Sequence, residues 1–280
     1  MKLALFNGNR LGLVIDQAIC DVTAALPHWD NAYAANWWLR LCHDFAQVKP
    51  ALDAAARAGQ GLPVDSVKLN AAALHPQKII AVASNYAGHV QEMRDRVNEA
   101  WLLDFGIFLK APSSIIGPGD TIDLPDVSDA DIHHEAELGL VIGKTGKNIP
   151  EAAALDYVLG YTGVIDVTLR GSGDRSSRKS YDGFTPIGPW LVTADEVGNP
   201  HDLRIRLWLN ENEENVRQHV NSGEMLVKIP AIIAYASRIM TLQPGDVITT
   251  GAPPGVGKIE PGDVVTLDID RIGRMTIFVR

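Results

Sequence analysis

Two glutamates, Glu135 and Glu137, stand two residues apart in the stretch IHHEAELGLVIG, which covers residues 132–143. The Leu, Val and Ile residues that follow are typical of a β-strand, in which alternate side chains share a face, so we expect His133, Glu135 and Glu137 on one face. Neighbouring carboxylates repel each other and lose solvation on burial, whereas a hard cation such as Mg²⁺ or Ca²⁺ between them removes both penalties. The pair therefore indicates a metal site, and a solvated edge strand with two exposed acids is the alternative.

A second pair, His89 and Glu92, falls in a predicted helix that begins near residue 89. Residues three apart on a helix lie on one face within hydrogen-bonding reach. A carboxylate that holds one ring nitrogen of a histidine leaves the other nitrogen free to act as a base. On spacing alone, an exposed helix pair without a function is the simpler interpretation.

Asp166 ends an apolar stretch, DYVLGYTGVID, and is followed by a basic, Gly/Ser-rich segment. An aspartate in this position is a natural third oxygen ligand, although by itself it is merely the end of a strand. The basic segment carries Arg170, Arg175, Arg178 and Lys179. It is either a solvated loop or, if the candidate ligands lie close by, a loop that binds an anion.

The composition excludes several classes of function. The chain has 280 residues, of which 46% are hydrophobic and 21% charged, and its formal net charge is −9. These values indicate a globular protein with one large domain, or one large and one small domain. The acidic balance argues against nucleic acid or an anionic membrane as the main partner. Two cysteines, no signal-peptide pattern and no apolar run of membrane-helix length make the cytoplasm the expected location.

The predicted elements divide the chain near residue 70. Short apolar runs before residue 22 predict a hairpin and a third strand, and apolar residues four apart predict a helix within residues 29–58. We interpret residues 1–70 as a small α/β domain and residues 71–280 as the catalytic domain. In the larger part, a strand at residues 79–83 leads into the helix with His89.

Collinear motifs over roughly residues 77–280 resemble the fumarylacetoacetate hydrolase family. In chain order they are KIIAVASNYAGHVQEM, FLKAPSSIIGPGD, HHEAELGLVIGK, DYVLGYTGVIDVT, RKSYDGFTPIGPWLVTADE, VRQHVNSGEML and LQPGDVITTGAPPGVG. The resemblance implies an α+β, β-rich fold in which a mixed sheet is rolled into a sandwich-like barrel. It also implies a smaller N-terminal domain and a homodimer.

The resemblance further implies a divalent cation, Mg²⁺ or alternatively Mn²⁺ or Ca²⁺, held by three carboxylates. The matching positions are Glu135, Glu137 and Asp166 for the metal, His89 for the base, Glu92 for its partner and Lys179 for the lysine of the K-S-F/Y-D motif. We expect further residues to bind the substrate: Lys110, Arg170, Arg175, Arg178, Tyr86 and Thr250, the last of which matches the threonine of the T-G-x-P loop. Tyr86 is alternatively a core residue.

Two departures from the family pattern concern the pocket. Gly88 stands where the family commonly has an aspartate before the histidine. Many members also carry an S-x-R-D-x-Q stretch, whereas this chain reads VTLRGSGDRSSR, with Arg170 retained and Gly171 in the aspartate position. We infer an altered pocket that selects an additional carboxylate through Arg175 or Arg178.

The resemblance implies a metal-dependent hydrolase that cleaves a carbon–carbon bond in an acylpyruvate or a related 2,4-dioxo acid, in the catabolism of aromatic compounds or sugar acids. The cation would bind the 2-oxo acid end and stabilise the enolate, His89 would take a proton from water, and Lys179 would stabilise the developing negative charge. Isomerases of 2-hydroxy-dienedioates and decarboxylases of 2-oxo acids, which use the same site without water attack, are one alternative. A non-catalytic metal-binding protein on the same scaffold is the other.

Overall fold

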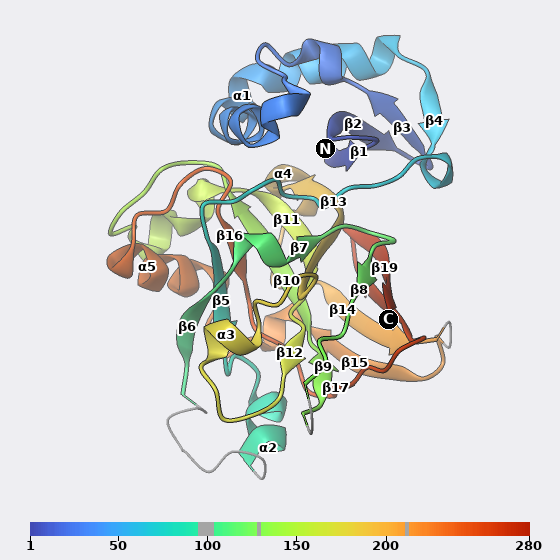
Figure 1. Ribbon diagram of the computed structural model, residues 1–280. Helices are drawn as coiled ribbons and strands as arrows, with labels where there is room; N and C mark the ends of the chain where they lie inside the picture. The colour runs from blue at the N-terminus through green and yellow to red at the C-terminus, as the bar shows by residue number, and fades with distance from the viewer. Residues whose placement is uncertain (95–103, 128–129, 211–212) are drawn as a thin grey trace.

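The computed structural model describes residues 1–94, 104–127, 130–210 and 213–280, and its strands form one large mixed sheet and two smaller sheets (Figure 1). The strands of the large sheet are β1 (Lys2–Phe6), β2 (Arg10–Ile15), β3 (Ala18–Asp21), β4 (Gly61–Pro63), β5 (Ile79–Ala83), β6 (Gly106–Lys110), β7 (Ile115–Ile116), β10 (Ala136–Ile142), β11 (Val158–Ile165), β13 (Thr185–Thr193) and β16 (Val247–Thr249). Their order is β4-β3-β2-β1-β13-β11-β10-β16-β5-β6, and β7 pairs with β13.

The smaller sheets complete the β-rich part of the fold. One contains β9 (Ile132–His134), β12 (Thr168–Leu169) and β17 (Gly257–Lys258) in the order β12-β9-β17. The other contains β8 (Thr121–Ile122), β14 (Arg204–Leu209), β15 (Val216–Asn221), β18 (Val264–Ile269) and β19 (Gly273–Val279) in the order β15-β14-β18-β19-β8. The expected α+β class, rich in mixed β-sheet, is confirmed.

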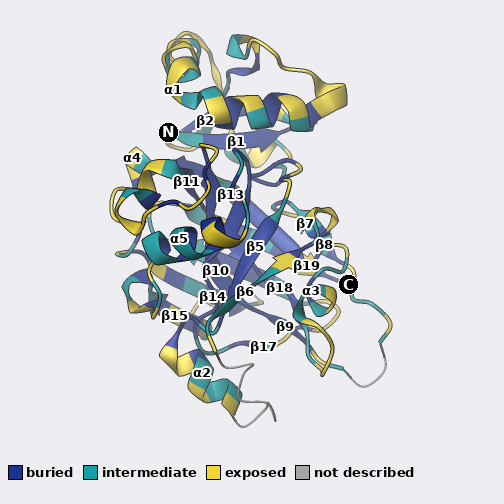
Figure 2. Ribbon diagram, turned by 90° about the vertical axis from the view of Figure 1, so that its left-hand side faces the viewer, coloured by how far each residue is buried: buried dark blue, intermediate teal, exposed yellow. Residues whose placement is uncertain are grey.

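The helices lie around this assembly of sheets (Figure 1). They are α1 (Ala34–Ala58), α2 (Ala87–Arg94), α3 (Arg175–Arg178), α4 (Ala194–Val197) and α5 (Ile229–Ile239), and η6 (Glu151–Tyr157) is a 3₁₀ helix. All residues of β5, β10 and β11 are buried, in agreement with their nearly unbroken apolar sequences. Figure 2 shows these central strands in the buried colour and exposed residues along the outer helices.

The N-terminal residues form the α/β unit that the sequence predicts, but this unit continues the large sheet. β1 pairs antiparallel with β13, with Lys2 opposite Val192, and β4 pairs with β3. Residues close to the predicted division thus contribute a strand, β4, to the large sheet. One apolar cluster joins Trp38 of α1 to Val164 of β11, so the division at residue 70 coincides with no break in the sheet or the core.

The strand directions explain how the site is assembled. β16 runs parallel to β5, β10 runs antiparallel to β16, and β11 runs antiparallel to β10. The ends of β5, β16 and β11 and the beginning of β10 consequently meet at one edge of the sheet. This edge brings together segments that are far apart in the sequence. They are the segments that follow residues 83, 165 and 249 and the segment that precedes residue 136.

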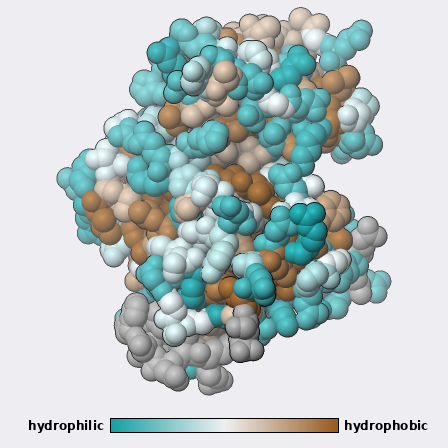
Figure 3. Space-filling model, in the orientation of Figure 1, coloured by the Kyte–Doolittle hydropathy of each residue, from teal (hydrophilic) through white to brown (hydrophobic). Residues whose placement is uncertain are grey.

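No helix in the described part of the chain combines the length and the apolar character needed to cross a bilayer. On the face drawn in Figure 3, hydrophilic and apolar residues alternate in patches.

Candidate active site

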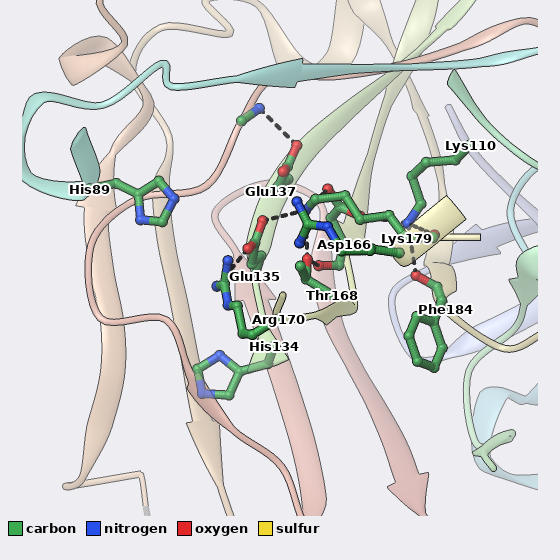
Figure 4. A network of polar contacts seen from close by, with 12 residues as sticks. His89, Lys110, His134, Glu135, Glu137, Asp166, Thr168, Arg170, Lys179 and Phe184 are labelled. Carbon is green, nitrogen blue, oxygen red and sulfur yellow. Dashed lines mark hydrogen bonds and ion pairs between the residues drawn. The ribbon is translucent and has the colours of Figure 1, made fainter. Parts of the chain in front are cut away.

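The three predicted acidic ligands converge at the edge of the large sheet. In the β10–β11 ladder Ala136 lies opposite Ile165, so the residues just beyond, Glu135 and Asp166, become neighbours. The Asp166 N–H donates to the Glu135 carbonyl oxygen at 2.8 Å. Carboxylate oxygens of Glu135, Glu137 and Asp166 all lie within 4.8 Å of one another, and all three residues are buried. The predicted convergence of three acids is therefore confirmed (Figure 4).

The strand that carries the two glutamates is interrupted at Glu135, between β9 and β10. The sequence predicts one continuous strand here. The Ala136 N–H donates to the side-chain oxygen of Gln218 at 2.9 Å. Of the three residues predicted to share a face, His133 and Glu135 line the same cavity, whereas Glu137 is not among the described residues that line it.

Lys179 bridges two of the acids. Its Nζ atom lies 2.8 Å from Glu135 Oε2 and 2.7 Å from Asp166 Oδ2, and it donates to Thr168 Oγ1 at 2.5 Å. Arg170 Nη2 lies 2.8 Å from the other oxygen of Glu135. Burial alone would raise the pKa of Glu135, but Lys179 and Arg170 hold it well below its usual range. Glu135 is therefore a carboxylate that the protein itself neutralises.

Glu137 has a different environment, although it is only two residues away. Its Oε2 atom accepts the Gly251 N–H at 2.7 Å. Burial, and then the charge of Asp166, raise the pKa of Glu137 to about 8. The charge of Lys179 opposes this rise without outweighing it, so the protein by itself does not favour the ionised form of Glu137.

The donor set fits a hard divalent cation. The set consists of carboxylate oxygens, which are the ligands that Mg²⁺, Mn²⁺ and Ca²⁺ prefer. The buried cluster also includes Glu137, and the protein alone does not favour the ionised form of this side chain. A cation held by Glu135, Glu137 and Asp166 would supply the missing positive charge.

Lys110 lies behind the acids. Its side chain is fully buried, and its Nζ atom contacts Asp166 Oδ1 at 2.5 Å, the Phe184 carbonyl oxygen at 3.1 Å and the Lys179 carbonyl oxygen. An ammonium group has three N–H donors, so these contacts use all of them. We therefore assign Lys110 to holding Asp166 and the backbone at Lys179, instead of the expected contact with substrate.

His89 and Glu92 form the contact that their spacing predicts. His89 Nδ1 lies 3.3 Å from Glu92 Oε2 on α2, and the same carboxylate oxygen accepts the Gly255 N–H at 3.3 Å. If Nδ1 donates to Glu92, Nε2 carries the lone pair. His89 lines the cavity, and in Figure 4 the acids lie between His89 and Lys179.

Gly88, one of the departures from the family pattern, packs against the loop after β16. A Cβ atom at this position would lie 2.9 Å from Pro254 Cγ, closer than side chains tolerate. Gly251 and Gly255 of the same loop have positive φ angles of 91° and 92°, and each donates its N–H to a site glutamate. An aspartate at position 88 would displace this loop.

A cavity of about 540 Å³ opens beside the acids. Several predicted site residues line it: His89, Glu135, Arg170, Arg175, Arg178 and Lys179. Two residues expected to bind substrate, Tyr86 and Thr250, lie behind its wall. Tyr86 is 2% exposed, and the Thr250 hydroxyl donates to the Leu138 carbonyl oxygen at 2.9 Å. We assign both to supporting positions.

Gln218 is a site residue that the sequence analysis did not identify. Its side-chain oxygen accepts from Ala136 and lies 3.0 Å from His134 Nδ1, while its amide nitrogen donates to the Pro253 carbonyl oxygen at 2.9 Å. Burial lowers the pKa of His134 to about 4, so this imidazole is neutral near pH 7. The alternation V-R-Q-H-V in β15 places Gln218 on the face of the buried Val220, and a buried amide requires such partners.

The comparisons with known proteins agree with this site. The family model described as "Fumarylacetoacetate (FAA) hydrolase C-terminal" matches residues 78–280. A maleylpyruvate hydrolase of Aquipseudomonas alcaligenes is 38% identical over 100% of this chain and 99% of its own length.

Solved structures extend the likeness to the whole fold. A maleylpyruvate hydrolase from Sphingobium sp. SYK-6, in complex with manganese(II) and pyruvate, is 40% identical with a TM-score of 0.89, over 100% of this chain and 98% of its own. A 2-hydroxyhepta-2,4-diene-1,7-dioate isomerase from Mycobacterium marinum is 37% identical with a TM-score of 0.67, over 79% of this chain and 80% of its own. The chain belongs to the fumarylacetoacetate hydrolase family.

Proposed function

We propose that this protein is a metal-dependent hydrolase that cleaves a carbon–carbon bond in an acylpyruvate or a related 2,4-dioxo acid. The observation that carries the proposal is that Glu135, a member of the three-carboxylate cluster, and His89, which contacts Glu92, line one cavity. The likeness to two maleylpyruvate hydrolases over nearly their whole lengths supports the same reaction class.

Glu135, Glu137 and Asp166 are the residues that would hold the metal, which we propose to be Mg²⁺ or Mn²⁺. Manganese is the ion bound in the similar Sphingobium hydrolase. When bound, a divalent cation supplies Lewis-acid stabilisation of negative charge on the oxygens of a 2-oxo acid.

His89 is the proposed base. With Nδ1 held by Glu92, its Nε2 atom would take a proton from water as the water oxygen bonds to the C4 carbonyl carbon of the substrate. The bond between C3 and C4 then breaks, its electron pair goes to C3, and C3 takes up a proton. The products are a carboxylic acid and pyruvate, and one water is consumed.

Lys179 and Arg170 are proposed to stabilise charge at the cavity wall. Both contact Glu135 and both line the cavity, so their cationic groups face the space a substrate would occupy. Burial opposes the charge of Lys179, but Asp166 and Glu135 outweigh it and raise the pKa of this ammonium group. Lys179 therefore stays charged at neutral pH and acts mainly by electrostatic stabilisation.

The direct test measures cleavage of acylpyruvates with Mg²⁺ or Mn²⁺ and identifies the products. We expect a carboxylic acid and pyruvate in equal amounts, loss of activity in EDTA and recovery on adding metal. Glu137→Ala should lose bound metal and activity together. Full activity of that variant in EDTA would contradict the metal assignment.

An isomerase is the second candidate, because the Mycobacterium marinum isomerase also resembles this chain. Isomerisation adds no water, so ¹⁸O-labelled water distinguishes the reactions. Hydrolysis places ¹⁸O in the carboxylic acid product, whereas isomerisation leaves the carbon skeleton intact. The contact between His89 and Glu92 favours hydrolysis, since it provides a base for water.

We also propose that the protein is cytoplasmic and, from the family resemblance, that it is a homodimer that takes part in the catabolism of aromatic compounds or sugar acids. Light scattering coupled to size-exclusion chromatography would test the dimer, and cell fractionation would test the location.

A further inference from the structure

Lys179 uses all of its hydrogen-bond donors at the cluster of acids (Figure 4). Its Nζ atom contacts Glu135 Oε2, Asp166 Oδ2 and Thr168 Oγ1, and an ammonium group has three N–H donors. Two of these acceptors belong to the acids that we propose as metal ligands. The Thr168 hydroxyl is the one acceptor that is neutral and lies outside the ligand set.

The two acids that hold Lys179 already share their charge among several cations. Lys179 takes one oxygen of Glu135 and one of Asp166. The other oxygen of Glu135 contacts Arg170. The other oxygen of Asp166 contacts Lys110. A divalent cation on the same acids would draw on the same oxygens and repel the ammonium group, because like charges repel. The acids alone would then hold Lys179 only weakly.

The Thr168 hydroxyl is oriented to accept from Lys179. It donates its own hydrogen to the Asp166 carbonyl oxygen at 3.0 Å, so its lone pairs are left for the Lys179 ammonium group, 2.5 Å away. Thr168 is fully buried and begins β12, where it pairs with His133 of β9. The backbone pairing therefore fixes the position of this acceptor.

Phe108 supplies a second neutral contact to the same ammonium group. Lys179 Nζ lies 5.4 Å from the centroid of the Phe108 ring, within the range of cation–π attraction. Phe108 lies in β6 opposite Ala81 of β5, and it lines the cavity. Lys110 follows two residues later on the same face of β6 and contacts the Lys179 carbonyl oxygen. One strand therefore contacts both ends of Lys179.

We propose that Thr168 and Phe108 form a neutral clamp that keeps the Lys179 ammonium group at the cavity after a divalent cation binds to the acids. A hydroxyl lone pair and the face of an aromatic ring attract an ammonium group without carrying a formal charge that a metal would compensate. Thr168 and Phe108 are then positioning residues, because they act through Lys179. This inference rests on the proposed function for the metal site and for the role of Lys179.

The test measures acylation of Lys179 by acetic anhydride, with peptide mass spectrometry, in EDTA and in saturating Mn²⁺. Lys179 is 7% exposed, so we expect its amine to be protected in the wild type under both conditions. Thr168→Val keeps the shape of the side chain but lacks the hydroxyl. In this variant the acids should still protect Lys179 in EDTA. Mn²⁺ should raise the rate of acylation by at least about tenfold, which corresponds to losing a hydrogen bond to a charged group.

Thr168→Ser is the matched control, because it keeps the hydroxyl, and it should protect Lys179 as the wild type does. Phe108→Leu removes the ring but keeps an apolar side chain. In Mn²⁺ it should raise the acylation rate by about twofold to thirtyfold, the range of a cation–π contact. The exposed Lys144 serves as the internal reference for labelling. Thermal melting checks that each variant is folded, and Phe108→Leu decides the question if Thr168→Val is not.

Kinetics measure the consequence for the proposed reaction. Thr168→Val should lower kcat for an acylpyruvate in Mn²⁺ by about tenfold to a hundredfold, and Thr168→Ser should restore it. Acylation of wild-type Lys179 in Mn²⁺ would overturn the clamp. Thr168→Val that stays protected in Mn²⁺, or that is acylated equally in EDTA and in Mn²⁺, would also overturn it.

The acylation experiment separates the clamp from the proposed function, because it requires no turnover. If the wild type cleaves no 2,4-dioxo acid but Mn²⁺ exposes Lys179 only in the clamp variants, the hydrolase proposal fails and the clamp stands. If cleavage depends on the metal but Lys179 stays protected in both clamp variants, the clamp fails alone. If calorimetry shows that the wild type binds no Mn²⁺, the metal assignment fails and the clamp fails with it.

Discussion

Glu135→Gln and Glu137→Gln should change the stability of the metal-free protein in opposite directions. The two acids are two residues apart and both are buried, yet Lys179 and Arg170 neutralise Glu135 while burial and Asp166 disfavour the charge on Glu137. Glutamine has nearly the shape of a protonated glutamate, so each substitution removes the charge without a cavity.

The sign for Glu137 follows from its raised pKa. The folded state favours the protonated form of Glu137. The stability that this form contributes is fully present below the ordinary pKa of 4.5 and is lost as the pH rises through about 8. One unit of pKa corresponds to about 1.4 kcal/mol, so at pH 7 the ionisable Glu137 lowers the free energy of unfolding by about 3 kcal/mol. In EDTA, Glu137→Gln should therefore be more stable than wild type by up to about 3 kcal/mol at pH 7, and the difference should vanish near pH 4.5.

The opposite sign applies to Glu135, whose pKa is lowered. Its contribution to stability is present above its ordinary pKa and is lost only in strong acid. Glu135→Gln leaves Lys179 and Arg170 without their shared carboxylate partner, and breaking a buried ion pair costs about 3–5 kcal/mol. This variant should be less stable than wild type at pH 7.

Urea unfolding of the three proteins at pH 5, 7 and 8.5, in EDTA and in excess Mn²⁺, measures these differences. Mn²⁺ at about 100 times its Kd should stabilise the wild type by about 2.7 kcal/mol. It should stabilise Glu137→Gln much less. If Glu137→Gln is destabilised in EDTA at pH 8.5, the assignment of Glu137 as an acid that requires a cation is refuted.

Three further substitutions test how the site is supported. Lys110→Met removes the buried partner of Asp166 and should lower the free energy of unfolding by about 3–5 kcal/mol in urea titrations; a change below about 1 kcal/mol would contradict this role. Gln218→Met leaves the Ala136 N–H without its acceptor, so unfolding should become easier by about 1–3 kcal/mol and calorimetry should show weaker Mn²⁺ binding; unaltered binding would exclude a positioning role. Gly255→Ala places a Cβ atom 1.9 Å from the Arg217 carbonyl oxygen, and should displace the loop and lower kcat more than Tm; wild-type kinetics would show that the loop adapts.

Some features of the fold and site could be predicted because they depend on neighbouring residues. The strand at residues 79–83 follows from an unbroken apolar run, and the structure places β5 there. The contact between His89 and Glu92 follows from helical spacing. Local periodicity in the sequence is enough to predict these features, and no knowledge of tertiary contacts is needed.

Other features depend on strand pairing, which local patterns do not encode. The residues between Glu135 and Asp166 in the sequence do not specify that these two acids are neighbours. The register of β10 against β11 makes them neighbours. Lys110 was expected to contact substrate, whereas packing buries its side chain against Asp166. The sequence alone determined which side chains were available for the chemistry. The tertiary structure decided which acid is neutralised by lysine and arginine, which acid is left for a cation, and which arginines face the cavity. The reason is that charge interactions depend on distances and burial, and only long-range packing sets these.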